Sequence, residues 1–215
     1  MILFWLIFSL LLGGGLAWYG ERRGPKMPGW ISLGALAFDL ILIAAIWIGS
    51  EPSLALTGGQ DASWILDFKV AWISRFGISF HLALDGLSLL LVALTVFLGV
   101  MAVACSWTEI SERVGFFHFN LLWTLAGVLG VFLALDLFLF FFFWEMMIIP
   151  MFLLIAVWGH ENRIYAAIKF FLFTQVTSLL MLAAILGLVY ARFKDTGTFS
   201  FDYGAWLKLQ MDPAL

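Results

Sequence analysis

Six long apolar stretches dominate this chain of 215 residues. A helix needs about 20 apolar residues to cross the hydrocarbon core of a membrane. Helices are expected because the backbone polar groups of a segment in lipid must pair within that segment. The sequence therefore predicts an all-α polytopic membrane helix bundle, with residues 1–215 forming one membrane domain. The expected spans are residues 2–19, 30–49, 84–106, 115–135, 138–158 and 164–190.

The overall composition agrees with a membrane protein and excludes several other classes. The chain is 64% hydrophobic and 12% charged, and its mean hydropathy is +1.06, whereas a soluble domain is about half apolar and a quarter charged. The net charge of −3 and the absence of a basic run give no sign of a nucleic-acid partner. The single cysteine, Cys105, excludes a disulfide framework and is expected to be a small buried apolar residue.

The connections between the spans are short except for residues 50–83, which form a long loop outside the membrane. Within it, FKVAWISRFGISFHL partly alternates between polar and apolar residues and predicts a small hairpin. Arg22, Arg23 and Lys26 lie in the first short connection, and the positive-inside rule places this connection in the cytoplasm. The N-terminus, the long loop and the tail would then lie outside, in the periplasm, although Arg192 and Lys194 in the tail oppose this orientation.

Glu145 is the strongest functional candidate among the ionisable residues within the apolar spans. It follows four phenylalanines and Trp144. It lies about eight residues, or about 12 Å, from the start of the fifth span near Leu137. A charge at the middle of a bilayer costs about 2.5–3.5 kcal/mol, so the group must face protein or water, pair with a cation, or be protonated. Burial favours the neutral acid and a nearby cation favours the carboxylate. Glu145 is therefore a candidate proton relay, and the alternative is a hydrogen-bonded helix-packing residue.

Other polar residues lie near Glu145 in the fifth and sixth spans. Pro150 removes the amide that would bond the carbonyl of Met146, so the helix there could kink and leave an acceptor for water. Lys169 lies a turn and a half into the sixth span, and it either reaches the cytoplasmic interface or lines a buried polar path. Thr174 and Ser178 share one face of this helix and could bond a neighbouring helix or water.

Three aspartates occupy different positions relative to the spans. Asp136 precedes the fifth span and Asp85 lies at the start of the third, so both are expected to cap a helix. Asp136 is also about half a turn out of phase with Glu145, so the two carboxylates do not form a close pair. Asp39 lies in the middle of the second span with no visible partner, and its role stays open.

The histidines and glycines point to no bound cofactor. His118 lies in the fourth span beside Asn120 and either lines a proton path or bonds another helix. His81 is expected near an interface. These two residues and His160 are too widely spaced to form a metal site, and no glycine-rich nucleotide motif is visible. The sequence predicts no metal and no cofactor in this chain.

Three segments carry a resemblance to a known family: RFGISFHLALDGLSLLLV, FLALDLFLFFFFWEMMIIPMFLLIAVWG and AAIKFFLFTQVTSLLMLAAILGLV. They resemble the antiporter-like membrane subunits of bacterial NADH–quinone oxidoreductase (respiratory complex I), and within these the subunit M family. The resemblance extends along essentially the whole chain, and the FFFFWEMMIIPMFLL block is the most specific part. Mrp-type sodium/proton antiporter subunits share the pattern less closely.

The resemblance implies a role for Glu145 as the proton-channel glutamate of the fifth span. In the family this glutamate works with a lysine on a broken seventh helix, which these 215 residues do not include. Lys169 matches a lysine that is common in the family's sixth span, but it is not that partner. Family members are about twice as long, so the chain is expected to be an N-terminal fragment, a truncated product or an incomplete sequence.

The resemblance also implies the setting in which the chain works. It would be a multi-pass protein of the bacterial inner membrane, in contact with lipid and with other membrane-arm subunits of complex I, including neighbouring antiporter-like subunits. NADH, FMN, iron–sulfur clusters and quinone would bind other subunits, so the chain would be part of a translocating enzyme without a redox site of its own. The alternatives are an Mrp-type sodium/proton antiporter subunit and a structural scaffold without pumping activity.

Overall fold

The computed structural model describes residues 1–49 and 64–207, and six of its helices are long and apolar enough to cross a membrane. Each coincides with one expected span, which confirms the predicted helical membrane fold. The largest difference is at the end of the sixth, which extends to Thr196 instead of residue 190. Residues 50–63 of the expected loop and 208–215 of the tail lie outside the described residues. The six helices are α1 (Ile2–Gly20), α2 (Met27–Gly49), α3 (Gly86–Glu109), α4 (Val114–Leu133), α5 (Leu137–Trp158) and α6 (Arg163–Thr196).

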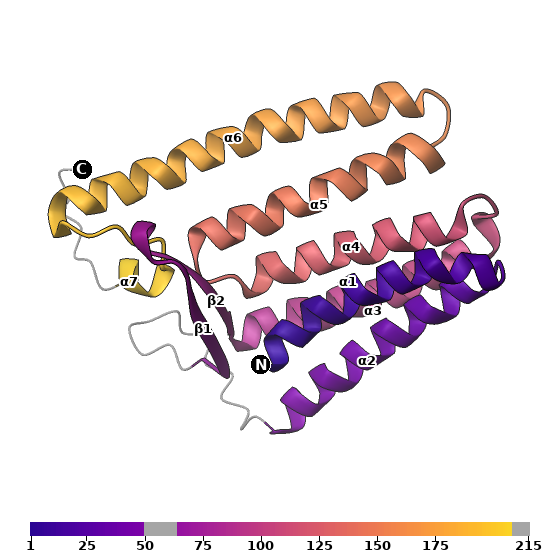
Figure 1. Ribbon diagram of the computed structural model, residues 1–215, viewed down its shortest axis with the longest axis horizontal. Coiled ribbons are helices and arrows are strands. Elements are labelled where there is room, and N and C mark those ends of the chain that lie inside the picture. The colour runs from indigo at the N-terminus through magenta and orange to yellow at the C-terminus, as the bar shows by residue number, and fades with distance from the viewer. Residues whose placement is uncertain (50–63, 208–215) are drawn as a thin grey trace.

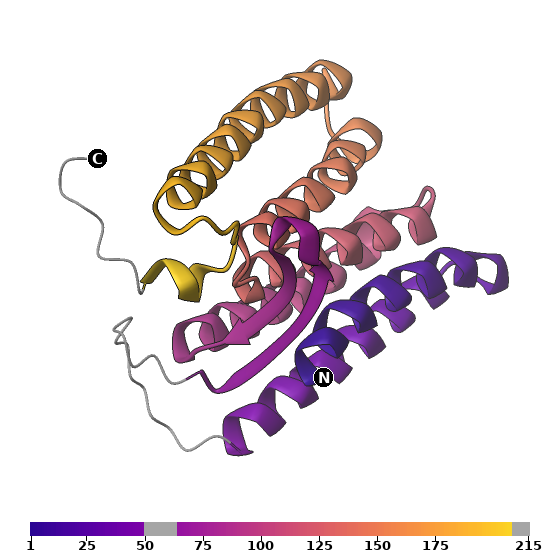
Figure 2. The same cartoon turned by 60° about the vertical axis from the view of Figure 1, so that its left-hand side comes forward.

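The helices lie side by side with their ends at two levels (Figures 1 and 2). Helix α1 packs against α2 and α4, and α5 lies between α4 and α6. The N-terminus, the hairpin and the short helix α7 (Tyr203–Leu207) lie at one end, and the α1–α2, α3–α4 and α5–α6 connections lie at the other (Figure 1). The arrangement places Arg22 and Arg23 at the end opposite the hairpin, and the assignment of that end to the cytoplasm stays a prediction.

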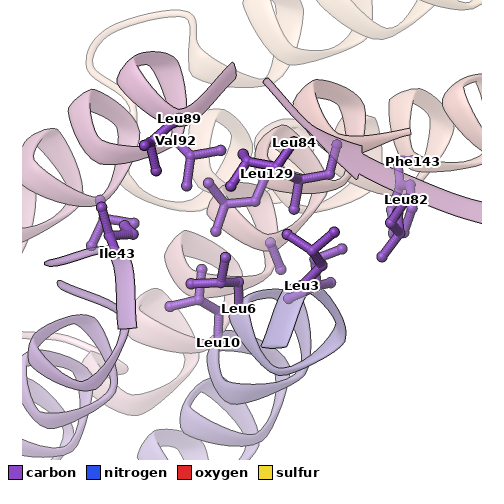
Figure 3. Close-up of a cluster of buried hydrophobic side chains, with 14 of the residues drawn as sticks. Leu3, Leu6, Leu10, Ile43, Leu82, Leu84, Leu89, Val92, Leu129 and Phe143 are labelled. Atoms are coloured by element: carbon purple, nitrogen blue, oxygen red, sulfur yellow. The ribbon is translucent and has the colours of Figure 1, made fainter. Parts of the chain in front are cut away.

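The main core is formed by residues of α1, α2, α3, α4, the first half of α5 and the second strand of the hairpin (Figure 3). Lipid is as apolar as these side chains, so close van der Waals packing rather than exclusion of water holds such helices together. The buried residues labelled in Figure 3 are Leu3, Leu6, Leu10, Ile43, Leu82, Leu84, Leu89, Val92, Leu129 and Phe143.

Two glycines of α4 allow α5 to approach closely. A Cβ atom added to Gly130 would lie 2.3 Å from the ring of Phe143, and one added to Gly127 would lie 2.8 Å from Cβ of Met147. Phe143 and Met147 are four residues apart and therefore share the face of α5 that packs on α4. Glu145 is two residues from each, or about 200° around the helix. The packing on α4 therefore turns Glu145 toward the opposite side, where α6 lies.

The predicted hairpin is confirmed in the described part of the long loop. Strand β1 (Leu66–Ile73) pairs antiparallel with β2 (Ile78–Leu84). A 3₁₀ turn, Ser74–Phe76, and Gly77 connect them. Gly77 has a φ of 68°, and a Cβ atom there would lie 2.1 Å from the carbonyl oxygen of Phe199. Glycine is required because a side chain would strain the backbone and would collide with the chain that follows α6.

The other edge of β2 is covered by the connection between α4 and α5. The Leu135 amide donates to the carbonyl of His81 at 2.9 Å. On its other side the same connection pairs with the segment after α6, because the Leu137 amide donates to the Phe201 carbonyl at 2.9 Å and the Tyr203 amide donates to the Leu135 carbonyl at 2.9 Å. The hairpin end of the molecule is therefore a hydrogen-bonded layer that joins the starts and ends of several helices.

Asp136 is central to this layer and caps α5, as the sequence predicts. Its Oδ1 accepts from the amides of Phe138 at 2.9 Å and Leu139 at 3.2 Å. Its Oδ2 accepts from the amide and hydroxyl of Ser79 at 2.9 and 3.1 Å. The side chain is completely buried, and these four bonds compensate its loss of water. Asp85 caps α3 as predicted, with the amide of Ser88 donating at 2.7 Å.

The expectation that Cys105 is buried is wrong. Its side chain is exposed on the outer face of α3. A small apolar side chain has no cost of exposure to lipid, so hydrophobicity alone does not indicate which face of a membrane helix points inward.

The two capping aspartates allow a matched test of the Asp136–Ser79 bonds. Asp85→Ala should lower the free energy of unfolding by about 1 kcal/mol, the usual value of an N-cap. Asp136→Ala should lower it by about 3 kcal/mol, because the buried donors of Ser79 also lose their acceptor. Thermal unfolding in detergent micelles, followed by circular dichroism, compares the two variants. Equal losses would mean that Asp136 acts only as a helix cap.

Candidate functional site

Glu145 lies in the middle of α5 and is held by two side chains of α6. The hydroxyl of Ser178 donates to Oε1, and Nε2 of Gln175 donates to Oε2 at 3.2 Å. Gln175 and Ser178 are three residues apart, so they lie on the same face of α6. The bond from Ser178 confirms that this hydroxyl reaches a neighbouring helix. Thr174 does not, because its hydroxyl donates to the carbonyl of Phe170 in its own helix at 2.7 Å.

The partners of Glu145 among the described residues are neutral. The ion pairs in residues 1–49 and 64–207 all lie in the hairpin layer, away from Glu145. Lys169 is exposed on α6, with Nζ 5.8 Å from the centre of the Tyr165 ring, one turn nearer the start of the helix. This position fits a lysine that extends toward the membrane interface, and its role on a polar path stays a prediction.

Pro150 lies inside α5, which continues through it to Trp158. Pro150 and Met146 line a groove of about 240 Å³ between α4 and α5, together with Asn120. Asn120 donates to the carbonyl of Phe116 at 2.7 Å, and its Oδ1 is buried without a partner in the described part of the chain. The groove is next to the turn that lacks the Pro150 amide, and the expected acceptor for water there stays a prediction.

His118 lies in a different place from Glu145. Its side chain is only 2% exposed, and Nδ1 has no hydrogen-bond partner within residues 1–49 and 64–207. It lines a cavity of about 280 Å³ together with Lys26, Ser106 and Trp107. That cavity is formed by the start of α2, the end of α3 and the start of α4, whereas the partners of Glu145 come from α6. The structure does not bring the two residues together, and a proton path through His118 stays a prediction.

Asp39 has a partner that the sequence did not reveal. The hydroxyl of Ser9 in α1 donates to its Oδ1 at 2.6 Å. The side chain is completely buried between the two helices, and its Oδ2 has no partner in the described residues. The two residues are 30 positions apart, and only the packing of α1 on α2 places them together.

A cluster of charged groups in the hairpin layer is the main feature that the sequence analysis missed. The ring of His81 lies between two carboxylates, with Nδ1 3.0 Å from Asp202 and Nε2 3.1 Å from Asp67. Lys69 also forms an ion pair with Asp202. Because both ring nitrogens face carboxylate oxygens, His81 can donate to both only when it is doubly protonated. No group of His, Cys, Asp and Glu in the described ranges is suited to hold a metal.

The cluster shifts the proton affinities of its members in opposite directions. Burial opposes the charged form of His81, but the hydrogen bonds and charges of Asp202 and Asp67 outweigh it and raise the pKa of His81 above its usual value of 6.5. Burial likewise opposes the charged form of Asp202, but His81 and Lys69 outweigh it and hold the pKa of that carboxyl far below its usual range. The cluster is therefore a set of ion pairs that links the hairpin to the segment after α6.

Comparison with known proteins relates the chain to subunits of NADH-quinone oxidoreductase. Residues 134–208 match the family described as NADH:quinone oxidoreductase/Mrp antiporter, TM. The chain is 56% identical over 219 residues to NADH-quinone oxidoreductase subunit M of Pseudomonas aeruginosa, with 99% of this chain and 43% of that protein covered. It is 51% identical over 216 residues to the subunit M of Escherichia coli strain K12, with 98% and 42% covered. The resemblance to subunit M is therefore confirmed, over less than half the length of these relatives.

A solved structure supports the same relationship. The chain is similar to a chain of respiratory complex I from Thermus thermophilus with bound NADH, with a TM-score of 0.72 and 27% identity. The match covers 99% of this chain and 40% of that chain. The arrangement of α1 to α6 with the hairpin is therefore shared with a subunit of a respiratory membrane complex.

The His81 cluster predicts a dependence of hairpin stability on pH. A raised pKa means that the contribution of His81 is complete below pH 6.5 and is lost as the pH rises through the raised value. The amides of β1 and β2 should therefore lose protection from hydrogen exchange as the pH rises above 6.5, by about tenfold after correction for the intrinsic rate. In a His81→Gln variant the corrected protection should not change over this range. The same pH dependence in both proteins would contradict the assignment.

Proposed function

We propose that this chain forms part of a proton-translocating membrane subunit of NADH–quinone oxidoreductase and that Glu145 is its proton relay. Identities of 51–56% to subunits M support the first statement. The second is supported by one observation above all: a carboxylate in the middle of α5 is held by hydrogen bonds from α6 and by no cation among the described residues.

A proton relay must be able to exist in two charge states at similar free energy. The charged form of Glu145 is opposed by the low dielectric of the bilayer, and the donors of Ser178 and Gln175 partly compensate this cost. A cation that approaches would stabilise the carboxylate, and its withdrawal would favour uptake of a proton. In the subunit M family the resemblance implies that a lysine on a later helix has this role. Proton transfer through Glu145 would in this way respond to charge elsewhere in the subunit.

The proposed setting follows from the same relatives. The chain would lie in the bacterial inner membrane, in contact with lipid and with other membrane-arm subunits of the complex, including neighbouring antiporter-like subunits. The energy would come from quinone reduction, and NADH, FMN, the iron–sulfur clusters and quinone would bind other subunits. The role of this chain in the enzyme would be to conduct protons, without a redox site of its own.

The name of the matching family includes Mrp antiporters, so exchange of sodium for protons is the second candidate function. The same acid could serve it, because a carboxylate that gains and loses a proton can also respond to a metal cation. Transport that depends on sodium and proceeds without NADH oxidation would favour this alternative. A scaffold without pumping activity is the third candidate.

Glu145→Gln in the intact complex tests the proposal. The amide keeps the size and polarity of the side chain but cannot exchange a proton, so NADH-driven proton transfer into vesicles should fall at least tenfold while the complex still assembles. Proton transfer and quinone-linked turnover at the wild-type rate would rule the relay out. A complex that pumps normally with Glu145→Gln but assembles poorly with Glu145→Ala would instead identify a packing residue.

A further inference from the structure

The hydroxyl of Ser178 has two acceptors at hydrogen-bond distance but only one hydrogen to donate. It contacts Oε1 of Glu145, and it also lies 3.1 Å from the carbonyl oxygen of Gln175 in its own helix. The side chain is 2% exposed, so solvent does not provide a third partner. The acceptor that it selects must therefore depend on the charge state of Glu145.

Counting hydrogens gives one arrangement for each charge state. When Glu145 is ionised, Oε1 is an acceptor only, and Ser178 donates to it. When Glu145 carries a proton on Oε1, the acid donates to Oγ of Ser178, and the hydroxyl hydrogen turns to the carbonyl of Gln175. Both arrangements leave every hydrogen with a partner, and the change requires only rotation about the Cβ–Oγ bond.

With its Nε2 turned to Glu145, the side chain of Gln175 favours a proton on Oε1 over one on Oε2. Its Nε2 donates to Oε2 of Glu145 at 3.2 Å. A proton on Oε2 would face this amide donor and break the bond, whereas a proton on Oε1 leaves Oε2 as a carbonyl oxygen that still accepts. Gln175 therefore keeps the same bond in both charge states, and protonation is directed to the oxygen that faces Ser178.

We propose that Ser178 and Gln175 are positioning residues that place the transferable proton of Glu145 on Oε1, with the Ser178 hydroxyl switching between two acceptors as that proton comes and goes. The inference rests on the proposed relay function of Glu145 and adds the residues that orient it. Both partners are neutral, so they hold the carboxyl group in place without fixing its charge.

The test uses the whole complex in liposomes and measures NADH-driven proton transfer as a function of pH. Ser178→Ala should lower proton transfer about ten- to a hundredfold, the effect expected for a lost hydrogen bond to a charged group, and should change the shape of the pH profile. Ser178→Thr keeps the hydroxyl and should restore most of the rate. Thr174→Val is the matched control, because the hydroxyl of Thr174 bonds only to its own helix, and it should leave rate and pH profile unchanged.

Infrared difference spectroscopy measures the hydrogen bonding of Glu145 directly, so it distinguishes a positioning role from a purely structural one. The carbonyl band of protonated Glu145, identified by its loss in Glu145→Gln, should shift in Ser178→Ala and in Gln175→Met, since each removes one of the two hydrogen bonds. It should not shift in Thr174→Val. An unshifted band in both Ser178→Ala and Gln175→Met would overturn the inference.

A double variant separates this inference from the proposed function. If Ser178 acts through Glu145, adding Ser178→Ala to Glu145→Gln should cause no further loss of proton transfer. A full additional loss in the double variant would show a structural role and overturn the positioning role. A wild-type rate in Glu145→Gln would refute the relay itself, whereas loss in Glu145→Gln with a normal rate and band in Ser178→Ala would refute only the positioning residues.

Discussion

A polar group within the apolar helices has no bulk water to bond with, so it must find its partner on another element or remain unpaired at considerable cost. Three carboxylates in these helices or at their ends meet this constraint in different ways. Asp136 is bonded by four donors, and Glu145 by two neutral side chains of α6. Within the described part of the chain, Asp39 is bonded by Ser9 alone. The carboxylate that caps a helix therefore has more donors than the two that lie within helices.

The same constraint connects the middle of the membrane to the hairpin layer. Helix α5 starts at Asp136, which is bonded to Ser79 of the hairpin. The chain that leaves α6 is fastened to the same hairpin through the contact between Asp202 and His81. The two helices that form the Glu145 site are therefore tied together at one end of the bundle. A hairpin at the end of the bundle thereby helps to fix the distance between a carboxyl group in the middle of α5 and its donors on α6.

The sequence predicted the features that depend on local pattern and missed those that depend on packing. Hydropathy over about 20 residues located the six helices, and capping chemistry identified Asp85 and Asp136. The contact between His81 and Asp202 spans 121 positions, and no local pattern encodes it. Gln175 was overlooked although it lies one turn from Ser178, which the sequence had singled out. Cys105 was placed on the wrong face, because lipid accepts an apolar side chain as readily as a helix interface does.

The neutrality of the donors around Glu145 has a physical consequence for a relay. A permanent cation at hydrogen-bond distance would stabilise the carboxylate so strongly that protonation would become rare. Hydrogen-bond donors such as Ser178 and Gln175 stabilise it by less, and a hydroxyl can also accept when the acid is protonated. In the proposed relay, the balance between the two charge states would be set by charges that move elsewhere in the complex. Such a site would keep its geometry constant while its charge changes, which is the property that coupling of proton transfer to a distant reaction requires.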